Sequence, residues 1–544
     1  MKKVILPNRR VHETPRLCLA DAYTFGSNEF ESEKAKEKST YYITFRRLLE
    51  KINETVYTKG DTRIIFVGLQ RILDKLFYEP ITHEEIDRAK EFAKGRKVTT
   101  QGFTDYQFPE EIWRSVVDDF NGRPPISIIA MPEGSVVYPN EPIVIIESQV
   151  DGMGILAAWF ESKLLQVWAA SERVTQNMHW FKYLRTTFMS INPELTKEDA
   201  GFFASIMLHD FGDRAGITKE ESEELGMVQL YTFSGTDTLA GGYQAYMNCD
   251  GKDSTGLFSS VNALAHRNVQ SYEFEQDCYG AIYDASGNHE LISMVADCYN
   301  FKNAVEHYLL PLAKKSIEEE NGKIVVGRPD SGNPLEQVIW MCRLAVKHGL
   351  FTTQTIGGKE WKFATSLHFI EGDGMTFDSM KEIIDALIEE GFMPYSWGIF
   401  GVGGGLRNSL KRDNLSAKYA LCAVGNEDKG VVKYGEVGKT TLQGPFKVLR
   451  SQKALQSCET IVKPEEEGDD AMIEYFNGAR ITKPYGIGQD DDFLTIKARI
   501  VEEFDSMPLT LQTEENGNYP ASKTILEGRI ELLDKYRNFE VATI

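Results

Sequence analysis

The sequence has few cysteines and no long hydrophobic run. Its seven cysteines are scattered and form no CxxC pair. This pattern excludes a zinc ribbon and a disulfide-stapled secreted domain, and it favours reduced thiols in the cytoplasm. No stretch of 18 or more apolar residues is present, so we expect no membrane-spanning helix. The first ten residues, MKKVILPNRR, lack the apolar segment of a secretory signal.

Basic residues are also in short supply. The chain has 60 Lys and Arg against 81 Asp and Glu, which gives a formal net charge of −21. A general nucleic-acid-binding protein needs a basic surface, so this class is excluded. The region 413–450 departs from the trend and contains Lys418, Lys429, Lys433, Lys439, Lys447 and Arg450. Such a group is either a solvated face or a local pocket for a small polyanion.

What the sequence does contain is the pattern of a mixed α/β protein. Its 544 residues, 42% of them hydrophobic, are typical of a globular protein with several domains. Residues 61–79 and 154–170 have helical spacing, and Thr82 with Glu85 forms a capping box that opens a further helix. Residues 126–148 are typical of strands separated by turns. A last helical segment is expected near 523–538.

From about residue 200 the pattern changes to short apolar runs that end in polar or glycine-rich clusters, each followed by a helical pattern. The clusters are LHDFGDRAG (208–216), SGTDTLAGG (234–242), NALAHRN (262–268), VADCYN (295–300), GRPDSGNP (327–334), IEGDG (370–374) and FGVGGG (400–405). This rhythm is typical of β/α units that close into a barrel, whose strand ends meet at one mouth. We therefore predict an α/β fold: an irregular (β/α) barrel over 181–410, and a mixed α/β domain over 1–180 that 411–544 completes.

The cluster GRPDSGNP carries more charge than a turn requires. Asn333 can cap the next helix and Pro334 suits its first position, so both are explained structurally. Arg328 and Asp330 have no part in capping. At the end of a barrel strand they would point into the mouth, and the alternative is a local ion pair.

Two glycine-rich clusters suggest a phosphate site. Backbone N–H groups near a helix start, unobstructed by side chains, bind phosphate well. Gly372 to Gly374 and Gly401 to Gly405 offer such backbone, and ordinary tight turns are the alternative. The second cluster is neither GxGxxG nor a P-loop. We expect Ser379 with Glu382 to cap the helix after the first cluster.

The remaining strand ends offer an aromatic ring and further charges. Each has a structural alternative: His266 as a core histidine, Phe211 as a core residue, Arg214 as a surface residue and Asp237 as a helix cap. Taken together, the clusters supply acids, cations, a ring and glycine turns at successive strand ends. This set suits a ligand with a phosphate, a sugar diol and a flat ring.

The motifs HDFGDR, GTDT, GRPDSGNP, GDG and FGVGGG, in this order, resemble the nicotinamide and nicotinate phosphoribosyltransferase family. IFVGLQRIL, MPEGSVVYPNEPI, KRDNLSAK and YFNGARITK also fit, so the likeness covers roughly 15–500. The resemblance implies a type II phosphoribosyltransferase fold and a homodimer with sites at its interface. It implies that nicotinamide and 5-phosphoribosyl-1-pyrophosphate give nicotinamide mononucleotide and pyrophosphate, the first step of NAD salvage. It further implies Mg²⁺ bound through phosphates, and ATP hydrolysis through a phosphohistidine.

The resemblance also assigns roles to residues. His266, Asp330 and Arg328 would be catalytic, and the metal ligands stay open. The pyridine ring would lie between Phe211 and the partner subunit's Tyr23, with Asp237 and Arg328 at the carboxamide. Asp330 would bind the ribose hydroxyls, and the ribose phosphate would contact Gly372, Asp373, Gly403 and Gly404. The pyrophosphate and ATP phosphates would contact Arg214, His266, the partner subunit's Arg412, the partner subunit's Lys418, Lys433, Lys447 and either Arg47 or Arg46.

Three alternatives compete with this hypothesis. A nicotinate phosphoribosyltransferase shares the fold, but Asp237 argues against it because a carboxylate accepts from an amide and repels a second carboxylate. A sugar-phosphate isomerase would need a proton-transfer pair. An inactive ligand-binding scaffold would have no use for Arg328, Asp330, Asp373 and His266.

Overall fold

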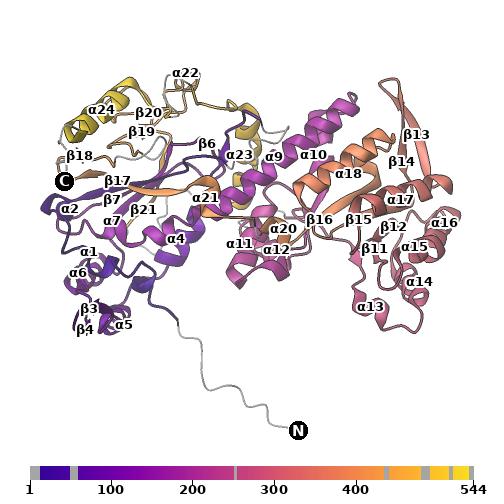
Figure 1. Ribbon diagram of the computed structural model, residues 1–544, viewed down its shortest axis with the longest axis horizontal. Coiled ribbons are helices and arrows are strands. Elements are labelled where there is room, and N and C mark those ends of the chain that lie inside the picture. The colour runs from indigo at the N-terminus through magenta and orange to yellow at the C-terminus, as the bar shows by residue number, and fades with distance from the viewer. Residues whose placement is uncertain are drawn as a thin grey trace, which may run out of the picture. The chain divides into compact units, whose positions relative to one another are not determined.

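The computed structural model describes residues 13–48, 59–249, 251, 254–407, 409–433, 440–479, 491–513 and 519–537. The chain forms two compact units (Figure 1). The first comprises Met1–Ser171, Arg412–Asp491 and Arg499–Ile544, and the second comprises Glu172–Lys411 and Asp492–Ala498. The observed boundary between the two units lies between residues 171 and 172, and the boundary expected from the sequence lies between 180 and 181. Both positions fall within helix α9 (Val167–Ile191).

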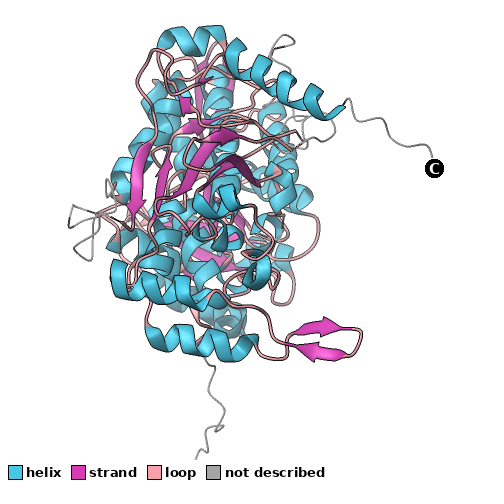
Figure 2. Cartoon of the chain, turned by 90° about the vertical axis from the view of Figure 1, so that its left-hand side faces the viewer, coloured by secondary structure: helices cyan, strands magenta, loops and turns pink. Residues whose placement is uncertain are grey.

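The first unit is organised around a six-stranded antiparallel sheet, and helices surround its strands (Figure 2). The strand order is β18 (Lys429–Gly430), β17 (Lys418–Val424), β1 (Ser39–Thr44), β7 (Pro142–Ser148), β5 (Ile126–Ala130) and β21 (Ile473–Asn477). β1 pairs with β7 on one side and β17 on the other. Segments from both ends of the chain therefore share one sheet and one core.

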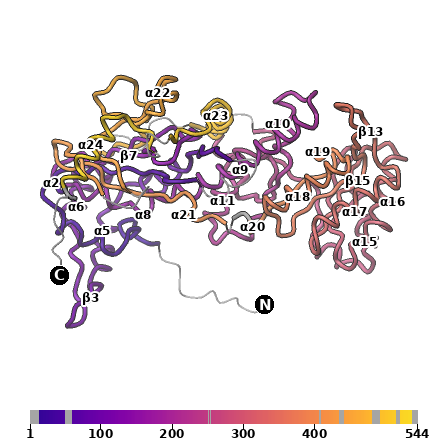
Figure 3. The backbone as a smooth tube through the Cα atoms, turned by 45° about the horizontal axis from the view of Figure 1, so that its top comes forward, coloured from indigo at the N-terminus to yellow at the C-terminus, as the bar shows by residue number. Residues whose placement is uncertain are grey.

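Short strand pairs and helices complete the first unit. The pairs are β2 (Ile64–Ile65) with β6 (Val136–Val137), β3 (Lys97–Thr99) with β4 (Gly102–Thr104), and β19 (Lys447–Val448) with β20 (Ile461–Val462). The β3–β4 hairpin projects from the unit (Figure 3). The helices are η1 (Arg16–Cys18), α1 (Thr24–Ser27), α2 (Glu33–Glu37), α4 (Leu69–Phe77), α5 (His83–Ala93), α6 (Glu110–Phe120), α7 (Leu156–Trp159), α8 (Glu161–Leu164), α21 (Arg412–Leu415), α22 (Gln452–Ser457), most of α23 (Phe493–Ser506) and α24 (Lys523–Arg537).

Sequence predictions for this unit hold for the strands and fail for two helices. The strands over 126–148, the helix near 523–538 and the Thr82–Glu85 capping box are confirmed. The helix predicted over 61–79 is wrong in its first half, because β2 occupies Ile64–Ile65 and Gly68, at φ 101°, starts α4 only at Leu69. The helix predicted over 154–170 is broken into α7, α8 and the start of α9. This break allows consecutive Trp159 and Phe160 both to pack against Trp113, at ring-centroid distances of 5.0 and 6.2 Å.

The second unit contains a seven-stranded parallel sheet. Its order is β10 (Asn262–Ala263), β11 (Leu291–Val295), β12 (Ile324–Arg328), β15 (Leu367–Glu371), β16 (Gly398–Val402), β8 (Leu208–Asp210) and β9 (Gly235–Thr236). Gly235 in the last strand forms a parallel bridge with Ser259, in the segment that leads to β10. The sheet therefore curls into an irregular barrel. Each of the seven predicted strand-end clusters lies at the end of one of these strands, so the α/β barrel prediction is confirmed.

Helices cover the outside of the parallel sheet, and the antiparallel hairpin β13 (Phe351–Ile356) with β14 (Lys359–Ala364) extends beside them (Figure 1). Besides α9, the helices of this unit are α10 (Lys197–Ile206), η2 (Asp213–Ala215), α11 (Lys219–Gln229), α12 (Leu239–Met247), α13 (His266–Gln270), α14 (Glu275–Ala285), α15 (Phe301–Ala304), η3 (Val305–Leu309), α16 (Leu310–Glu318), α17 (Pro334–Lys347), α18 (Phe377–Glu389), α19 (Pro394–Trp397) and α20 (Gly404–Arg407). Of all the helices in the described ranges, none is long and apolar enough to span a bilayer.

Two helix starts test the capping predictions. Asn333 caps α17, since its side chain accepts from the Glu336 N–H at 3.0 Å. The predicted cap at Ser379 is wrong. Thr376 is the N-cap of α18, and its hydroxyl accepts from the Ser379 N–H at 3.3 Å, which leaves Ser379 inside the first turn.

Helices α11 and α12 cross at a pair of buried glycines. A Cβ added to Gly241 would lie 2.3 Å from the carbonyl carbon of Gly226 and 2.5 Å from its Cα. Backbone cannot yield as a flexible side chain can, so only glycine permits this approach. The crossing fixes the start of α12, directly after Asp237.

We expect Gly241→Ala to lower the free energy of unfolding by about 1–3 kcal/mol, because the two helix backbones must separate. Gly280→Ala in α14 is the matched control, since nothing lies within 4 Å of its added Cβ. There the loss of a helical glycine should stabilise the protein by roughly 0.5–1 kcal/mol. Urea unfolding measures both variants, and wild-type stability of Gly241→Ala would contradict the close crossing.

Candidate functional site

The candidate site lies at one edge of the barrel sheet. Because all seven strands are parallel, their C-terminal ends lie on the same edge. In sheet order, the residues that follow these strands are His266, Asp297, Asp330, Gly372 with Asp373, Gly403 with Gly404, Phe211 with Arg214, and Asp237. The topology thus brings together every predicted site residue of the second unit.

A histidine and two carboxylates form the first cluster at this edge. The Nε2 atom of His266 lies 3.0 Å from Oδ1 of Asp297 and 3.8 Å from Oδ2 of Asp330. The Ser331 hydroxyl donates to the other oxygen of Asp297 at 2.6 Å. The His266 side chain is 40% exposed whereas that of Asp297 is 8% exposed. His266 is therefore not a core histidine: a buried carboxylate orients an accessible imidazole.

Arg328 and Asp330 form a loose ion pair. Nη2 of Arg328 lies 3.8 Å from Oδ2 of Asp330, the oxygen that also faces His266. The Nε of Arg328 is buried and has no hydrogen-bond partner within the described part of the chain. A local ion pair therefore exists, but it leaves donor capacity on the guanidinium and acceptor capacity on the carboxylate.

The ring of Phe211 lies on glycine backbone. The backbone N–H of Phe211 donates to the carbonyl oxygen of Val402 at 2.8 Å, which places the residue beside β16. A Cβ added to Gly401 would lie 2.0 Å from the ring, and one added to Gly372 would lie 3.1 Å from it. The ring is half-buried. The glycines at these two strand ends therefore form a flat surface on which the aromatic ring packs, in addition to any role in turning the chain.

Asp237 presents a carboxylate beyond the end of β9. Its N–H donates to Asp210 O at 2.9 Å, its side chain is exposed, and the Ser260 hydroxyl donates to its Oδ1. The alternative role as a helix cap is wrong, because Thr238 is the N-cap of α12. Burial lowers the pKa of the neighbouring His209, and the negative charge of Asp237 opposes this shift.

The phosphate-binding candidates of this unit lie at adjacent strand ends. Gly403 follows β16, Gly404 begins α20, and both are half-buried. Arg214 lies in η2 with an exposed side chain, and the exposed Asp373 follows Gly372. Backbone N–H groups, one cation and one carboxylate are thus available beside the Phe211 ring.

Two acids at this edge were missed by sequence reasoning, Asp297 and Glu371. Asp297 lies in the cluster VADCYN, but its role depends on the distance to His266, which no spacing reveals. Glu371 is 1% exposed and accepts the Asp373 N–H at 3.0 Å. Burial raises the pKa of Glu371 to about 7, and the charges of Asp373 and Asp330 add to this effect. The sequence did offer one signal for Glu371, because this acid directly precedes the turn Gly372–Gly374.

The first unit carries the predicted cations. Lys418 and Lys433 line a pocket of about 230 Å³ together with Thr441. Burial, then the positive charges of Lys433, Arg46 and Arg412, hold the pKa of Lys418 below its ordinary value. The charge of Glu161 acts in the opposite direction, but cations outnumber this one carboxylate, so the pocket is suited to an anion.

Neighbouring arginines attach to the segment 413–416. Arg46 donates to the Ser416 hydroxyl at 3.0 Å, Arg47 to Asp413 O at 2.9 Å, and Arg412 pairs with the Asp413 carboxylate at 2.8 Å. Arg46 is half-buried and Arg47 is exposed. Both arginines therefore lie near the basic pocket, and the geometry does not select one of them.

Tyr23 and Lys447 belong neither to this pocket lining nor to the group of arginines around Asp413. Tyr23 is 64% exposed and donates to Asp21 at 3.3 Å. The ammonium of Lys447 donates to the carbonyl oxygens of Glu466 at 2.6 Å and Gly468 at 2.7 Å. Lys447 is thus tied to a loop of its own unit.

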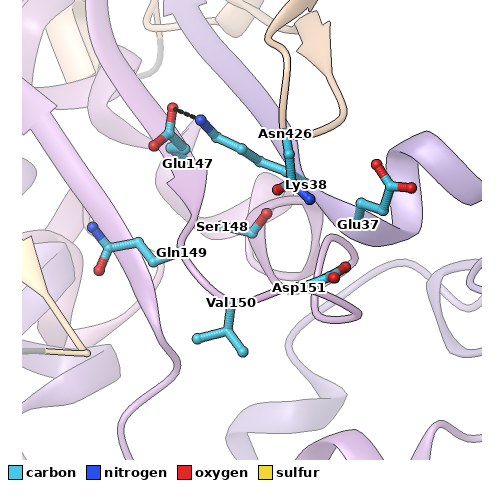
Figure 4. A pocket seen from close by; sticks show the side chains of 8 residues that line it. All are labelled: Glu37, Lys38, Glu147, Ser148, Gln149, Val150, Asp151 and Asn426. Carbon is cyan, nitrogen blue, oxygen red and sulfur yellow. Dashed lines mark ion pairs between the residues drawn. The ribbon is translucent and has the colours of Figure 1, made fainter.

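A second pocket of the first unit, of about 280 Å³, contains none of the predicted residues (Figure 4). Lys38 lies at its wall and pairs with Glu147 at 3.2 Å and Asp428 at 2.8 Å. The cation is neutralised by its neighbours, and the remaining charged lining residues, Glu37 and Asp151, are acidic. This pocket therefore does not suit a phosphorylated substrate.

Protein ligands for a metal are not gathered at the site. Within the residues that the structure describes, no group of three or more His, Cys, Asp or Glu side chains is arranged to hold an ion. Mg²⁺ commonly binds through substrate phosphates and water with only one or two carboxylates. The exposed Asp373 and half-exposed Asp330 fit that limited role.

Family comparisons agree with the geometry. The model of the nicotinate phosphoribosyltransferase (NAPRTase) family matches residues 206–440, and the model of the nicotinamide phosphoribosyltransferase N-terminal domain matches residues 18–128. The first match contains every predicted site residue of the barrel unit, together with Arg412, Lys418 and Lys433. The second contains Tyr23, Arg46 and Arg47.

Individual relatives point to the same family, and solved structures share the fold. The chain is 27% identical over 438 residues to a nicotinamide phosphoribosyltransferase of Xanthomonas campestris pv. campestris, covering 78% of this chain and 88% of that protein. It is 25% identical over 285 residues to a nicotinamide phosphoribosyltransferase of Mycoplasma pneumoniae, covering 49% of this chain and 58% of that protein. The fold is similar to that of human nicotinic acid phosphoribosyltransferase, with a TM-score of 0.54, 13% identity and coverage of 94% and 99% of the two chains. The Pyrococcus furiosus nicotinate-nucleotide pyrophosphorylase gives a TM-score of 0.52 at 14% identity, covering 93% and 98%. The chain belongs to the nicotinate and nicotinamide phosphoribosyltransferase family and is a phosphoribosyltransferase with the type II fold.

Proposed function

We propose that this enzyme joins nicotinamide to 5-phosphoribosyl-1-pyrophosphate, giving nicotinamide mononucleotide and pyrophosphate, the first step of NAD salvage. The observation that carries the proposal is one sheet edge that presents the Phe211 ring, the Asp237 carboxylate and the Arg328–Asp330 pair. The curated relatives named nicotinamide phosphoribosyltransferase support it.

The chemistry requires positioning and charge stabilisation. When the bond between ribose C1 and pyrophosphate breaks, the ribose ring becomes positive and the leaving group carries negative charge. No protein nucleophile is needed, so pre-arranged groups supply the catalysis. Phe211 would stack on the pyridine so that its nitrogen faces C1, and Asp330 would hold the ribose hydroxyls. Mg²⁺ bound through phosphate oxygens would neutralise part of the leaving-group charge.

Basic residues would stabilise the leaving group. Lys418, Lys433 and Arg412, with Arg46 or Arg47, form the cation-rich part of the first unit, and the positive charges around Lys418 outnumber the one carboxylate, Glu161, that acts on it. In the proposed arrangement they bind pyrophosphate and ATP phosphates together with Arg214. Lys447 is a weaker candidate, because its ammonium is already bound to two carbonyl oxygens.

Asp237 would select the base. An ionised carboxylate accepts the carboxamide N–H of nicotinamide and repels the carboxylate of nicotinate. At ~4 Å this repulsion ranges from about 1 kcal/mol in bulk water to about 4 kcal/mol in a partly shielded site. Because Asp237 is exposed in the free enzyme, the repulsion energy is close to the lower value until the substrate covers the carboxylate.

We expect Asp237→Ala to lower kcat/KM for nicotinamide and to reduce the preference for nicotinamide over nicotinate by roughly tenfold or more. Paired assays with phosphoribosyl pyrophosphate, Mg²⁺ and either base measure this ratio through the mononucleotide formed. Asp277→Ala, which removes another exposed carboxylate of the same unit, is the control and should keep the wild-type ratio. Product from nicotinate alone would identify a nicotinate phosphoribosyltransferase, and no product from either base would refute the activity.

The assembly we propose is a homodimer with sites at the interface, in which Tyr23 and the cations come from the partner subunit. One face of α12 supports it. Leu239, Tyr243, Tyr246 and Met247 are 74%, 59%, 54% and 57% exposed and recur at helical spacing. A contiguous apolar face beside a candidate active site is typical of a protein interface.

We expect the full chain to sediment as a dimer and the double variant Tyr243→Glu, Tyr246→Glu to sediment as a monomer with little activity, because buried charge would disrupt the apolar contact. The control is Phe202→Glu, which changes an exposed aromatic residue on α10. A dimeric, active double variant would contradict the assignment of α12 to the interface.

ATP would act through His266. Its imidazole is accessible, and with Nε2–H donated to Asp297 the Nδ1 lone pair is available for a phosphoryl group. The γ-phosphoryl group would move from ATP to this nitrogen, releasing ADP, and water would later release phosphate. Such a step would make the transfer reaction more favourable by linking it to ATP hydrolysis.

We expect His266→Ala to abolish the stimulation by ATP, and Asp297→Ala to weaken it at least several-fold, because the imidazole loses its orienting acceptor. Mononucleotide formation with and without ATP measures stimulation, and acid-labile incorporation of labelled phosphate measures the phosphohistidine. The control His289→Ala changes a histidine that precedes the N-terminal end of β11, whereas the candidate site lies at the C-terminal ends of the strands. Full stimulation of the His266→Ala variant would contradict this role.

A cytoplasmic location stays a prediction, which rests on seven cysteines that are all free.

A further inference from the structure

The first unit also contains a pocket of about 390 Å³ that the proposed reaction does not use. Its walls come from β18, the segment 443–445, the turn after β20 and one face of helix α24 (Figure 1). Most of these segments lie beyond residue 440, where the match to the family model ends. None of the predicted site residues lines the pocket, so the transfer reaction does not explain it.

Hydrogen bonds hold the walls of this pocket together. The Glu466 carboxylate accepts from the Lys463 N–H at 2.8 Å and from the Ser522 hydroxyl at 3.0 Å, which ties the turn after β20 to the start of α24. On the opposite wall, Nε2 of Gln443 donates to the carbonyl oxygen of Ile525 in α24 at 2.8 Å. Segments that are distant in the sequence therefore form a fixed hollow.

A glycine in α24 keeps the hollow open. A Cβ added to Gly528 would meet only Nε2 of Gln443 within 4 Å, at 3.0 Å. Glycine destabilises the interior of a helix relative to alanine, so it is a costly choice at this position. Because Gly528 lines the pocket, a longer side chain there would extend into the hollow.

Two lysines without partners give the pocket a local excess of positive charge. Lys429 and Lys463 line it, and within the part of the chain that the structure describes neither ammonium has a hydrogen bond or an ion pair. Of the two acids in the lining, Asp428 is paired with Lys38 at 2.8 Å, and Glu465 is exposed and unpaired. Two unpaired cations thus face one unpaired carboxylate, in a chain whose net charge is −21. This balance favours an anion.

The rest of the lining is apolar, apart from one unsatisfied acceptor. Ile525, Leu532 and Pro445 supply hydrocarbon surface. Gln443 is 8% exposed, and its Oε1 is buried and has no hydrogen-bond partner among the described residues. An unpaired buried acceptor costs free energy, which an N–H or O–H group of an occupant would recover.

We propose that this pocket binds a small organic anion with an apolar body. The acid group lies at Lys429 and Lys463, the body packs against Ile525 and Leu532, and an N–H or O–H group of the ligand donates to Oε1 of Gln443. The site is separate from the phosphoribosyl transfer site. Its ligand therefore binds whether or not the proposed function is correct.

Calorimetric titration of the full chain with indole-3-acetate tests the ligand class, because this molecule combines a carboxylate, an apolar ring system and an N–H donor. We expect it to bind. 1-Methylindole-3-acetate lacks the N–H and should bind roughly threefold to tenfold more weakly. Tryptamine carries an ammonium in place of the acid and should give no measurable binding. No binding of indole-3-acetate at millimolar concentration would overturn the proposal, and equal affinity for the methylated acid would refute the contact with Gln443.

Charge variants locate the bound acid. The double variant Lys429→Ala, Lys463→Ala should weaken indole-3-acetate binding by roughly tenfold, and Glu465→Gln should strengthen it by roughly twofold. The control is Lys453→Ala, which removes an exposed lysine on α22 of the same unit, outside the pocket lining, and should keep the wild-type affinity. Wild-type affinity of the double variant would overturn the proposal.

Filling the hollow is an independent test. Gly528→Met should abolish binding because its side chain occupies the pocket, whereas Gly280→Met, at an open position of α14 in the other unit, should not change binding. A melting temperature close to that of the wild type shows that each variant is folded, and if Gly528→Met does not fold, the lysine variant decides. A folded Gly528→Met protein that binds with wild-type affinity would contradict the site. Calorimetry requires no turnover, so absence of transferase activity would refute the proposed function and leave this result standing.

Discussion

The candidate site depends on the parallel alignment of seven strands. Parallel pairing places every C-terminal strand end on one edge, so residues that lie more than a hundred positions apart, such as Phe211 and Arg328, share one location. Each strand end contributes one or two groups: an imidazole, carboxylates, a guanidinium, a ring or glycine backbone. The helix crossing at Gly226 and Gly241 and the Asn333 cap fix the starts of the helices that follow two of these strands, and so fix where the connecting loops end.

At that edge, glycines leave room for a larger side chain, and buried acids position exposed groups. The Phe211 ring occupies space that only glycine at 401 leaves open, and it also packs closely on Gly372. Asp297 has little access to solvent and orients His266, which is accessible. Glu371 supports the turn that carries Asp373. Buried acids thus position the exposed groups that would meet the substrate, which is how a site keeps its geometry before the ligand arrives.

Much of this arrangement could be predicted from the sequence, because periodicity and turn chemistry are local. The seven strand ends and the Asn333 cap followed from such patterns. The helices expected over 61–79 and 154–170 were partly wrong, because Gly68 and the packing of Trp159 and Phe160 override helical spacing. Asp297 and Glu371 were missed, since their roles depend on distances across neighbouring strands. The family motifs placed His266 and Asp330 at a common site, but not the 3.8 Å between them.

The central claim is that one edge of the barrel holds a pyridine and a phosphorylated ribose together. A crystal structure of the enzyme with nicotinamide mononucleotide tests it most directly. The account predicts the pyridine on the Phe211 ring with its carboxamide at Asp237, the ribose hydroxyls at Asp330, and the phosphate at the Gly372–Asp373 and Gly403–Gly404 backbone. A nucleotide bound elsewhere, or one bound at this edge with its phosphate at Asp237 and its ring in solvent, would contradict it.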